Sequence, residues 1–411
     1  MLANRRDFFK GAAAFAALGA FSGKALARGE KPMNNPIWLM TSAFPGESFE
    51  DVLKRAKSVG AQGLELCVFR RGSDRKDHTA THLDYESFDL EAAKRVVARC
   101  NEEGLRVSVG SYDNLIGGKP ENQILNQDHV LKLIRIAALL GGDTNDVVCG
   151  TFPGYDVALG NEDRGFEKNL EKFKKVFTPI LKYAKDLGVT VCIENCPMEG
   201  WQPVTSTDCY CNLSGCLAAR KLMYAILDDS SALQETYDPS HDAWQHIDPT
   251  DVINAMDFSK LRRVHIKGTR NLPTESAAIH WGRLYPEQYV NPELAKKAGV
   301  PVPENEWARL NYEPRLPGFG GSDSIDWSRF LENLMAKGFK FPFVIENEGC
   351  NSSHTKNMGA TMQGFKATIL NTAPVIWPLG ANGYAYDPSA VKPMAMTRTA
   401  DLPVVSMKDL T

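Results

Sequence analysis

Four residues with metal-binding side chains stand at or near the ends of four apolar, β-rich runs between residues 191 and 346. Glu194 closes VCIE, Asp238 follows ETY, His265 lies in RRVHI and Glu346 follows FPFVI. One carboxylate at such a place means little, since strand ends are where solvent begins. Four in succession form a pattern, because oxygen-rich ligands with one imidazole suit a hard or borderline divalent cation. We expect one divalent metal, Mn²⁺ first, with Mg²⁺, Co²⁺ or Zn²⁺ as alternatives.

A cation held in this way points to a particular chemistry. Bound to two neighbouring oxygens of a hydroxy-ketone, it stabilises the enediolate that forms when a proton leaves the carbon bearing the hydroxyl. Glu194 and Glu346 would be the catalytic pair that removes and returns this proton from either face. The pattern therefore indicates an isomerase or epimerase that abstracts a proton next to a metal-bound carbonyl of a sugar or keto-sugar.

Five further residues are candidates for substrate binding. Pro239 turns the chain after Asp238, so His241 can point into the same mouth, and Lys267 lies two residues beyond His265 on the same side of its strand. A packed histidine and a solvated lysine are the alternatives for these two. The remaining candidates lie at or just after strand ends and are Glu65, Trp244 and Arg270.

The elements that must position these residues repeat along the chain. Five helical runs each end in a glycine and pass within a few residues into a β-rich run; the glycines are Gly60, Gly104, Gly141, Gly188 and Gly338. Weaker runs at 37–40, 235–238 and 263–266 bring the candidate strands to eight, and helices are predicted at 49–59, 90–103, 166–187 and 326–337.

Eight strands alternating with helices predict an α/β fold, a parallel (β/α)8 TIM barrel, with its active site at the carboxyl ends of the strands. A doubly wound open sheet is the alternative, but no Gly-rich dinucleotide fingerprint follows the first strand. About sixty residues separate the strand ending at Ile266 from the next helix, where 2 to 6 are usual. We expect this insertion, and a shorter one at 195–214, to form long loops over the catalytic face.

Three segments are predicted from the N-terminus to the C-terminus. Residues 1–27 resemble a twin-arginine signal peptide, with Arg5 and Arg6, an apolar run at 11–21 and a small-residue cleavage site at 25–27. Residues 28–371 form the catalytic barrel. Residues 372–411, rich in Pro, Gly and Ala, form an extended C-terminal tail. We therefore expect a protein exported to the periplasm, and since the apolar run is too short to span a bilayer, one without a permanent membrane anchor.

Composition limits the partners. The chain of 411 residues is 43% hydrophobic and 24% charged, with a net charge of -3, so it has no electrostatic footprint for nucleic acid. We expect a small-molecule sugar or keto-sugar as partner, and a homo-oligomer stays open. Of nine cysteines, Cys196, Cys209, Cys211 and Cys216 fall in one segment. A disulfide within this segment is favoured over structural zinc, because paired C-x-x-C units are missing.

At these residues the chain resembles the xylose isomerase-like barrel superfamily, in particular the sugar isomerases and epimerases related to tagatose epimerases and inosose dehydratases. The resemblance covers 37–371 and rests on IENCP, DPSHDAWQHID, VHIKG, PGFG and VIENEG in this order. It implies that Glu194, Asp238, His265 and Glu346 bind the metal, that the two glutamates are the acid/base pair and that His241 lies near the substrate.

Three other functions have to be weighed. The export signal and the long insertion are unlike the compact cytoplasmic epimerases, and exported relatives with the DPSH form look similar to enzymes acting on 3-keto-glycosides. For these substrates the same enediolate chemistry makes a lyase or dehydratase the first alternative. A non-catalytic periplasmic sugar-binding protein is the second, although it needs no acid/base pair. A DNA-repair endonuclease of the same superfamily requires several metals, more histidines and a basic groove, which the composition disfavours.

Overall fold

Eight parallel strands close into a barrel in a computed structural model that describes residues 35–44, 46–72, 82–197, 212–271, 291–300, 312–317, 323–347, 365–366 and 391–411. The strands are hydrogen-bonded in the order β1-β10-β7-β6-β5-β4-β3-β2. Their bounds are β1 Ile37–Met40, β2 Gly63–Cys67, β3 Arg106–Asn114, β4 Cys149–Phe152, β5 Val191–Glu194, β6 Leu233–Tyr237, β7 Leu261–Ile266 and β10 Phe343–Ile345. The predicted TIM barrel is confirmed.

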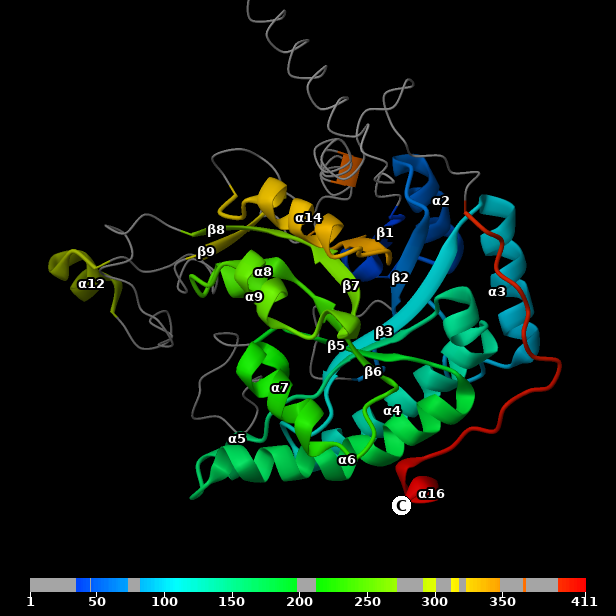
Figure 1. Ribbon diagram of the computed structural model, residues 1–411, viewed down its shortest axis with the longest axis horizontal. Helices are drawn as coiled ribbons and strands as arrows, with labels where there is room; N and C mark the ends of the chain where they lie inside the picture. Colours follow the sequence, from blue (N-terminus) through cyan, green and yellow to red (C-terminus); the bar gives the residue numbers. More distant parts are fainter. Residues whose placement is uncertain are drawn as a thin grey trace, which may run out of the picture.

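Helices between the strands cover the outside of the barrel (Figure 1). Those of 10 residues or more are α2 Phe49–Val59, α3 Leu90–Glu103, α4 Pro120–Leu139, α6 Gly165–Leu187, α7 Leu217–Ile226 and α14 Trp327–Ala336. Shorter ones are α5 Val157–Gly160, α8 Pro239–Ala243 and α9 Pro249–Ala255. The predicted bounds of α2 and α3 are those of the structure. Gly60 and Gly104 end these two helices with a positive φ, as a left-handed cap requires.

Two apolar layers follow from the alternation of side chains along each strand. The larger layer lies between the strands and the surrounding helices. The smaller one fills the barrel itself and consists of Trp38, Met40, Cys67, Phe69, Tyr112, Phe152, Cys196 and Val344. A barrel interior filled in this way is a packed core and not a channel.

The long insertion after β7 contains a small antiparallel hairpin, β8 Gly268–Asn271 with β9 Tyr312–Arg315, and the helix α12 Pro292–Ala298, which stands away from the barrel in Figure 1. The amide of Asn271 donates to the carbonyl of Ala243 at 2.9 Å, so the hairpin lies beside α8. Other parts of the insertion, and most of the loop at 195–214 with Cys209 and Cys211, lie outside the described residues. Cys216 is a free, exposed thiol, so it takes no part in the expected disulfide.

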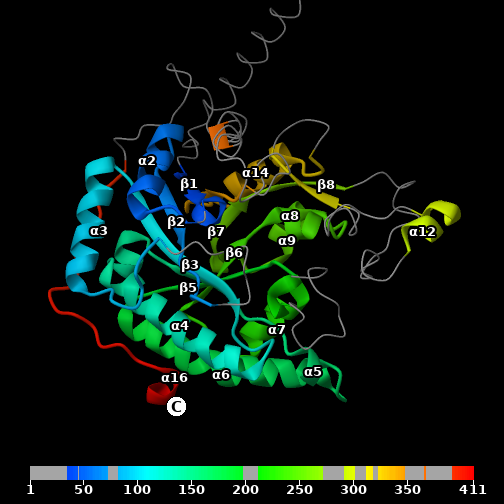
Figure 2. The ribbon, with the colours of Figure 1, turned by 180° about the vertical axis from the view of Figure 1, so that it is seen from behind.

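The last 21 residues, 391–411, run along the outside of the barrel past α3 to α16 Met407–Leu410, which lies beside α4 and α6 (Figures 1 and 2). Asn101 and Asn145 each pair through the side-chain amide with the main chain of this segment, at Met394 and Ala395. The predicted signal peptide and residues 372–390 lie outside the described residues, so the segment boundaries stay predictions. Within the described part of the chain, no helix is long and apolar enough to cross a membrane.

Candidate metal centre

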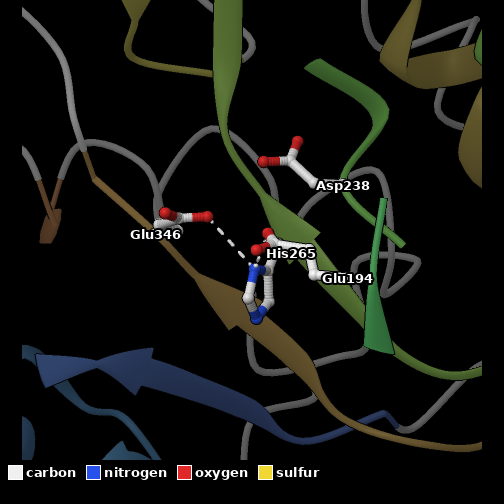
Figure 3. Close-up of side chains that lie close together, drawn as sticks. All are labelled: Glu194, Asp238, His265 and Glu346. Carbon is white, nitrogen blue, oxygen red and sulfur yellow. Dashed lines mark hydrogen bonds and ion pairs between the residues drawn. The ribbon is translucent and has the colours of Figure 1, made fainter. Parts of the chain in front are cut away.

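The four predicted ligands come together at one end of the barrel (Figure 3). Glu194 is the last residue of β5, Asp238 directly follows β6, His265 is the fifth residue of β7, and Glu346 directly follows β10. One candidate ligand atom from each residue lies within 4.8 Å of those of the other three. They converge because parallel strands in a closed barrel all end at the same mouth.

The imidazole of His265 is oriented by two of the carboxylates. Its Nδ1 lies 2.8 Å from Oε1 of Glu194 and 3.1 Å from Oε2 of Glu346, while the other ring nitrogen points away from the remaining three side chains (Figure 3). The two glutamates reach β7 from opposite directions around the barrel, since β10 is its neighbour on one side and β6 and β5 follow on the other. Nδ1 is therefore the nitrogen available to a metal.

Burial perturbs the titration of this group. It raises the pKa of Asp238 to about 7, with repulsion from Glu346 and Glu194 acting in the same direction and Lys267 against it. The pKa of Glu194 is raised by burial and by the charge of Glu346. Burial acts to lower the pKa of His265, but nearby carboxylates outweigh it and raise that pKa well above its ordinary value. Protons bound to these side chains thus offset part of the buried negative charge, and a bound cation could offset it instead.

A divalent cation fits this donor set. Three carboxylates and one imidazole nitrogen, all buried, face a common point, and oxygen-rich sets of this kind bind hard or borderline divalent ions. Burying three like charges is costly unless positive charge lies among them. The donors therefore suit one divalent ion, and they do not by themselves select among Mn²⁺, Mg²⁺, Co²⁺ and Zn²⁺.

Two of the predicted substrate residues border the ligands. The Nζ of Lys267 lies 2.9 Å from Oδ2 of Asp238 and 3.1 Å from Oε2 of Glu346. The Nε2 of His241, in α8, lies 3.3 Å from the same Asp238 oxygen and 3.4 Å from the Lys267 amine. Both side chains are buried. They are placed to contact a molecule that reaches the ligands.

Glu65, another predicted substrate residue, contacts Tyr112 and His265. Its side chain is 1% exposed, and its Oε1 accepts a short hydrogen bond from the hydroxyl of Tyr112 and lies 3.4 Å from Nε2 of His265. Burial acts to raise the pKa of Glu65, but His265 and Tyr112 outweigh it, so that pKa is lowered. These contacts are made to His265 and Tyr112, and the predicted role of Glu65 in substrate binding stays a prediction.

Trp244 and Arg270 are half-buried in segments that follow the ligand strands. Trp244 directly follows α8, and Arg270 is the third residue of β8. Their predicted role in substrate binding stays a prediction.

Asn195 joins the ends of two ligand strands, a role that the sequence analysis missed. Its side-chain oxygen accepts from the Asp238 main-chain N–H at 2.7 Å, and its amide donates to the Asp238 carbonyl at 3.0 Å. Asp242 accepts from the same amide and from the hydroxyl of Tyr237. A repeated signal was present, because an asparagine follows both ligand glutamates in the two IEN triplets.

Tyr112 was also missed; it lies in β3, which continues past Gly110 to Asn114. Continuing the alternation by two residues would have placed Tyr112 inside the barrel with Gly110.

The fold agrees with what comparison with known proteins shows. The chain belongs to the xylose isomerase-like TIM barrel family, whose model matches residues 53–367. No curated protein matches the chain.

Solved structures with the same fold include sugar epimerases and a dehydratase. A D-psicose 3-epimerase from Clostridium cellulolyticum H10 is 13% identical, with a TM-score of 0.50 over 83% of this chain and 99% of that one. A 3-keto-D-glucoside 4-epimerase from E. coli is 14% identical, with a TM-score of 0.50 over 82% and 98%. The probable 3-DHS dehydratase AsbF from Bacillus anthracis is 15% identical, with a TM-score of 0.50 over 82% and 98%. At such identities the likeness shows the fold alone.

Proposed function

We propose that this protein is a divalent-metal-dependent sugar isomerase or epimerase that moves a proton on the carbon next to a carbonyl. The observation that carries the proposal is the placement of Glu194 and Glu346, which reach Nδ1 of His265 from opposite sides of β7. The enzymatic neighbours of the same fold support it. Mn²⁺ is the proposed metal, held by Glu194, Asp238, His265 and Glu346.

The chain's own residues supply the proton transfers. A bound divalent ion would contribute Lewis-acid polarisation of the substrate carbonyl. Glu194 and Glu346 are the proposed catalytic residues, one as a carboxylate that accepts the proton from carbon and the other as a carboxylic acid that donates its own proton to the opposite face. The raised pKa of Glu194, caused by burial and by Glu346, brings it closer to the neutral range in which a general acid or base works best.

Lys267 and His241 would orient the substrate. The Lys267 ammonium lies between Asp238 and Glu346 and can donate to a substrate oxygen, where positive charge favours the enediolate over the neutral ketone. Nε2 of His241 lies 3.9 Å from Oε1 of Glu194, close enough to contact a hydroxyl at the reacting carbon.

The proposed substrate class is a sugar or keto-sugar, with 3-keto-glycosides as the first to test. One structural neighbour is named as a 3-keto-D-glucoside 4-epimerase and another as a probable dehydratase. The second name supports the lyase alternative, in which the same proton abstraction expels the group on the next carbon. The two outcomes share the first step and differ in the product.

The experiment is solvent exchange. The purified Mn²⁺-loaded protein is incubated in heavy water with a panel of aldoses, ketoses and 3-keto-glycosides; each mixture is quenched, Mn²⁺ is removed, and the substrate proton signals are read by NMR. We expect one signal beside a carbonyl to disappear, and the chelator-treated protein to leave it intact. A new epimer indicates an epimerase, whereas release of the neighbouring group indicates a lyase.

Glu346→Gln and Glu194→Gln test the acid/base pair. Each should retain the fold and slow the exchange by about 100-fold or more, the scale of general acid/base catalysis. Exchange at the wild-type rate in both variants would contradict the assigned roles. A wild-type protein that binds sugars without exchanging any proton would instead be a binding protein.

Export to the periplasm through the twin-arginine route is part of the proposal and rests on Arg5, Arg6 and the apolar run that follows. A reporter fused after residue 27 should be exported, and the double substitution of Arg5→Lys and Arg6→Lys should retain it in the cytoplasm. Export of the double variant at the normal level would argue against this route.

A further inference from the structure

A buried carboxylate that the proposed reaction does not use lies beside the candidate metal centre. Glu65 extends from β2 into the barrel and is 1% exposed. An ionised side chain buried to this extent needs partners, because the desolvation of an unpaired carboxylate costs several kcal/mol, on the order of the whole stability of many domains. The partners of Glu65 therefore indicate its role.

Those partners form a chain across three strands. The hydroxyl of Tyr112, on β3, donates to Oε1 of Glu65, and the same oxygen lies 3.4 Å from Nε2 of His265, on β7. The Tyr112 ring also packs edge-on against the imidazole, with centroids 6.3 Å apart. Glu65 and Tyr112 thus contact the side of the imidazole that does not face the other ligands.

Two glycines leave the space that Tyr112 occupies. A Cβ atom on Gly150 of β4 would come within 2.6 Å of the Tyr112 hydroxyl oxygen, and one on Gly110 of β3 within 3.2 Å of its ring. Neither glycine has the positive φ that would call for glycine on backbone grounds. The packing of Tyr112 across them accounts for the absence of a side chain at both positions.

We propose that Glu65, fixed by Tyr112, is a positioning residue for the metal ligand His265. A carboxylate at Nε2 favours the tautomer with hydrogen on that nitrogen, which leaves the lone pair of Nδ1 directed toward Glu194 and Glu346. It also increases the basicity of the ligand nitrogen. This inference rests on the proposed metal centre and adds two residues to it that touch neither the metal nor the substrate.

The other role considered for Glu65 is direct contact with a substrate hydroxyl. The two roles predict different losses. A positioning residue determines the affinity for the metal ion alone, in the absence of any sugar, whereas a hydroxyl binder affects only the KM for substrate. Measurement of Mn²⁺ binding without substrate therefore separates them.

Metal-free protein is titrated with Mn²⁺ alone, and free Mn²⁺ is counted by its EPR signal. We expect Glu65→Gln to raise the Kd for Mn²⁺ by about 10- to 100-fold, the usual effect of removing a partner of a metal-bound histidine. Tyr112→Phe should raise it less, since Glu65 keeps its charge. Gly150→Ala should raise the Kd as well, because the added methyl group displaces the Tyr112 hydroxyl. In the Tyr112→Phe protein, which lacks this hydroxyl, Gly150→Ala should raise the Kd less.

A spectroscopic measurement tests the orientation directly. In the Mg²⁺-loaded protein, which is diamagnetic, His265 should show a proton on Nε2 that exchanges slowly with water, and this resonance should shift and broaden in Glu65→Gln. Glu235→Gln is the matched control, since Glu235 is a buried glutamate of β6 whose partner is Arg220 of α7. It should leave both the Kd and the resonance unchanged, whatever its effect on the melting temperature.

The outcomes are distinguishable. Wild-type affinity for Mn²⁺ in folded Glu65→Gln would overturn the inference, and with a raised KM it would restore the role in hydroxyl binding. If Glu65→Gln fails to fold, an unchanged Kd in both Tyr112→Phe and Gly150→Ala overturns the inference equally. A wild-type protein that binds no divalent ion would instead remove the proposed metal centre on which the inference rests.

Discussion

At the level of single residues, Lys267 brings an ammonium into a group of buried carboxylates. It pairs with Asp238 and Glu346 and is 5% exposed. Removing one partner of a buried ion pair costs about 3–5 kcal/mol, because the other charge stays buried without compensation. A divalent ion at the same carboxylates would replace part of the lost positive charge.

We therefore expect Lys267→Met to lower the free energy of unfolding by about 3 kcal/mol in chelator and by clearly less with Mn²⁺ present. Urea unfolding in both conditions measures the difference. Lys182→Met is the control, since the Lys182–Asp186 pair is exposed and contributes little. An equal loss for Lys267→Met with and without Mn²⁺ would argue against a cation at these carboxylates.

His129 predicts a pH dependence that does not involve the metal centre. It is buried on α4, where its Nε2 lies 2.6 Å from the Val68 carbonyl oxygen, and burial lowers its pKa to about 4, with Lys132 and Arg70 acting in the same direction. Below the unfolded pKa of about 6.5, the unfolded chain binds a proton that the native state does not. The protein should therefore lose stability as the pH falls from 6.5 toward 4.

Between pH 7 and pH 5 this group should account for a loss of about 2 kcal/mol in the free energy of unfolding. His129→Gln keeps an amide donor for Val68 and does not titrate, so its loss over the same interval should be smaller by that amount. Urea unfolding at both pH values, at saturating Mg²⁺, gives the comparison. The same pH dependence in both proteins would show that His129 does not carry it.

At the scale of elements, three strands meet at the base of the barrel interior. Trp38 of β1 lies over Gly63 of β2, and the guanidinium of Arg263 on β7 stacks on the indole at 5.0 Å from the ring centroid. Arg263 is two residues before His265 and so faces the same interior. A Cβ atom on Gly63 would come within 2.6 Å of the indole.

Gly63→Ala should consequently lower the free energy of unfolding by about 1–3 kcal/mol through overpacking. Trp38→Phe should lower the free energy of unfolding less in the Gly63→Ala protein than in the wild type, since the smaller ring relieves the clash. Gly188→Ala is the comparison: its φ of +71° makes alanine strained, but its Cβ meets no atom within 4 Å. It should be additive with Trp38→Phe. Additivity for Gly63→Ala would contradict the packing account.

At the scale of the whole molecule, the C-terminal segment 391–411 binds to the barrel on a side remote from the ligands. Arg135 of α4 is buried and donates to the carbonyl of Leu402 at 2.6 Å, pairs with Asp401 at 2.8 Å and also donates to the carbonyl of Phe88. Met394 is 3% exposed within the main core. The segment thus buries apolar surface of the barrel and provides partners for the buried guanidinium of Arg135.

Ending the chain after residue 390 should therefore lower the melting temperature, since Arg135 loses two acceptors and apolar surface on α3, α4 and α6 is exposed. The Kd for Mn²⁺ should stay unchanged, because these contacts lie outside the barrel. The truncation and Arg135→Met together should lower the melting temperature by less than the sum of their separate effects, because both remove the same contacts. A truncated protein with altered Mn²⁺ affinity would show that the segment supports the site.

The kinds of residue and their places at strand ends were determined by the sequence. Regular alternation of helix, glycine and strand predicts a barrel, and a closed barrel brings all strand ends to one mouth. Glu194, Asp238, His265 and Glu346 could therefore be grouped before any distance was known. Helix bounds such as 49–59 were predictable because the cap signals at Ser48 and Gly60 are local.

The tertiary structure alone decided which side chains touch across the barrel. Glu65 on β2 and Tyr112 on β3 contact the imidazole of His265 on β7, which lies about 150 residues or more further along the chain. Lys267 likewise lies between Asp238 and Glu346, which follow β6 and β10. A strand pattern gives the face on which a side chain lies, but not how far it reaches or what it meets. Those depend on barrel closure and on the space left at Gly110 and Gly150, which only the packed interior defines.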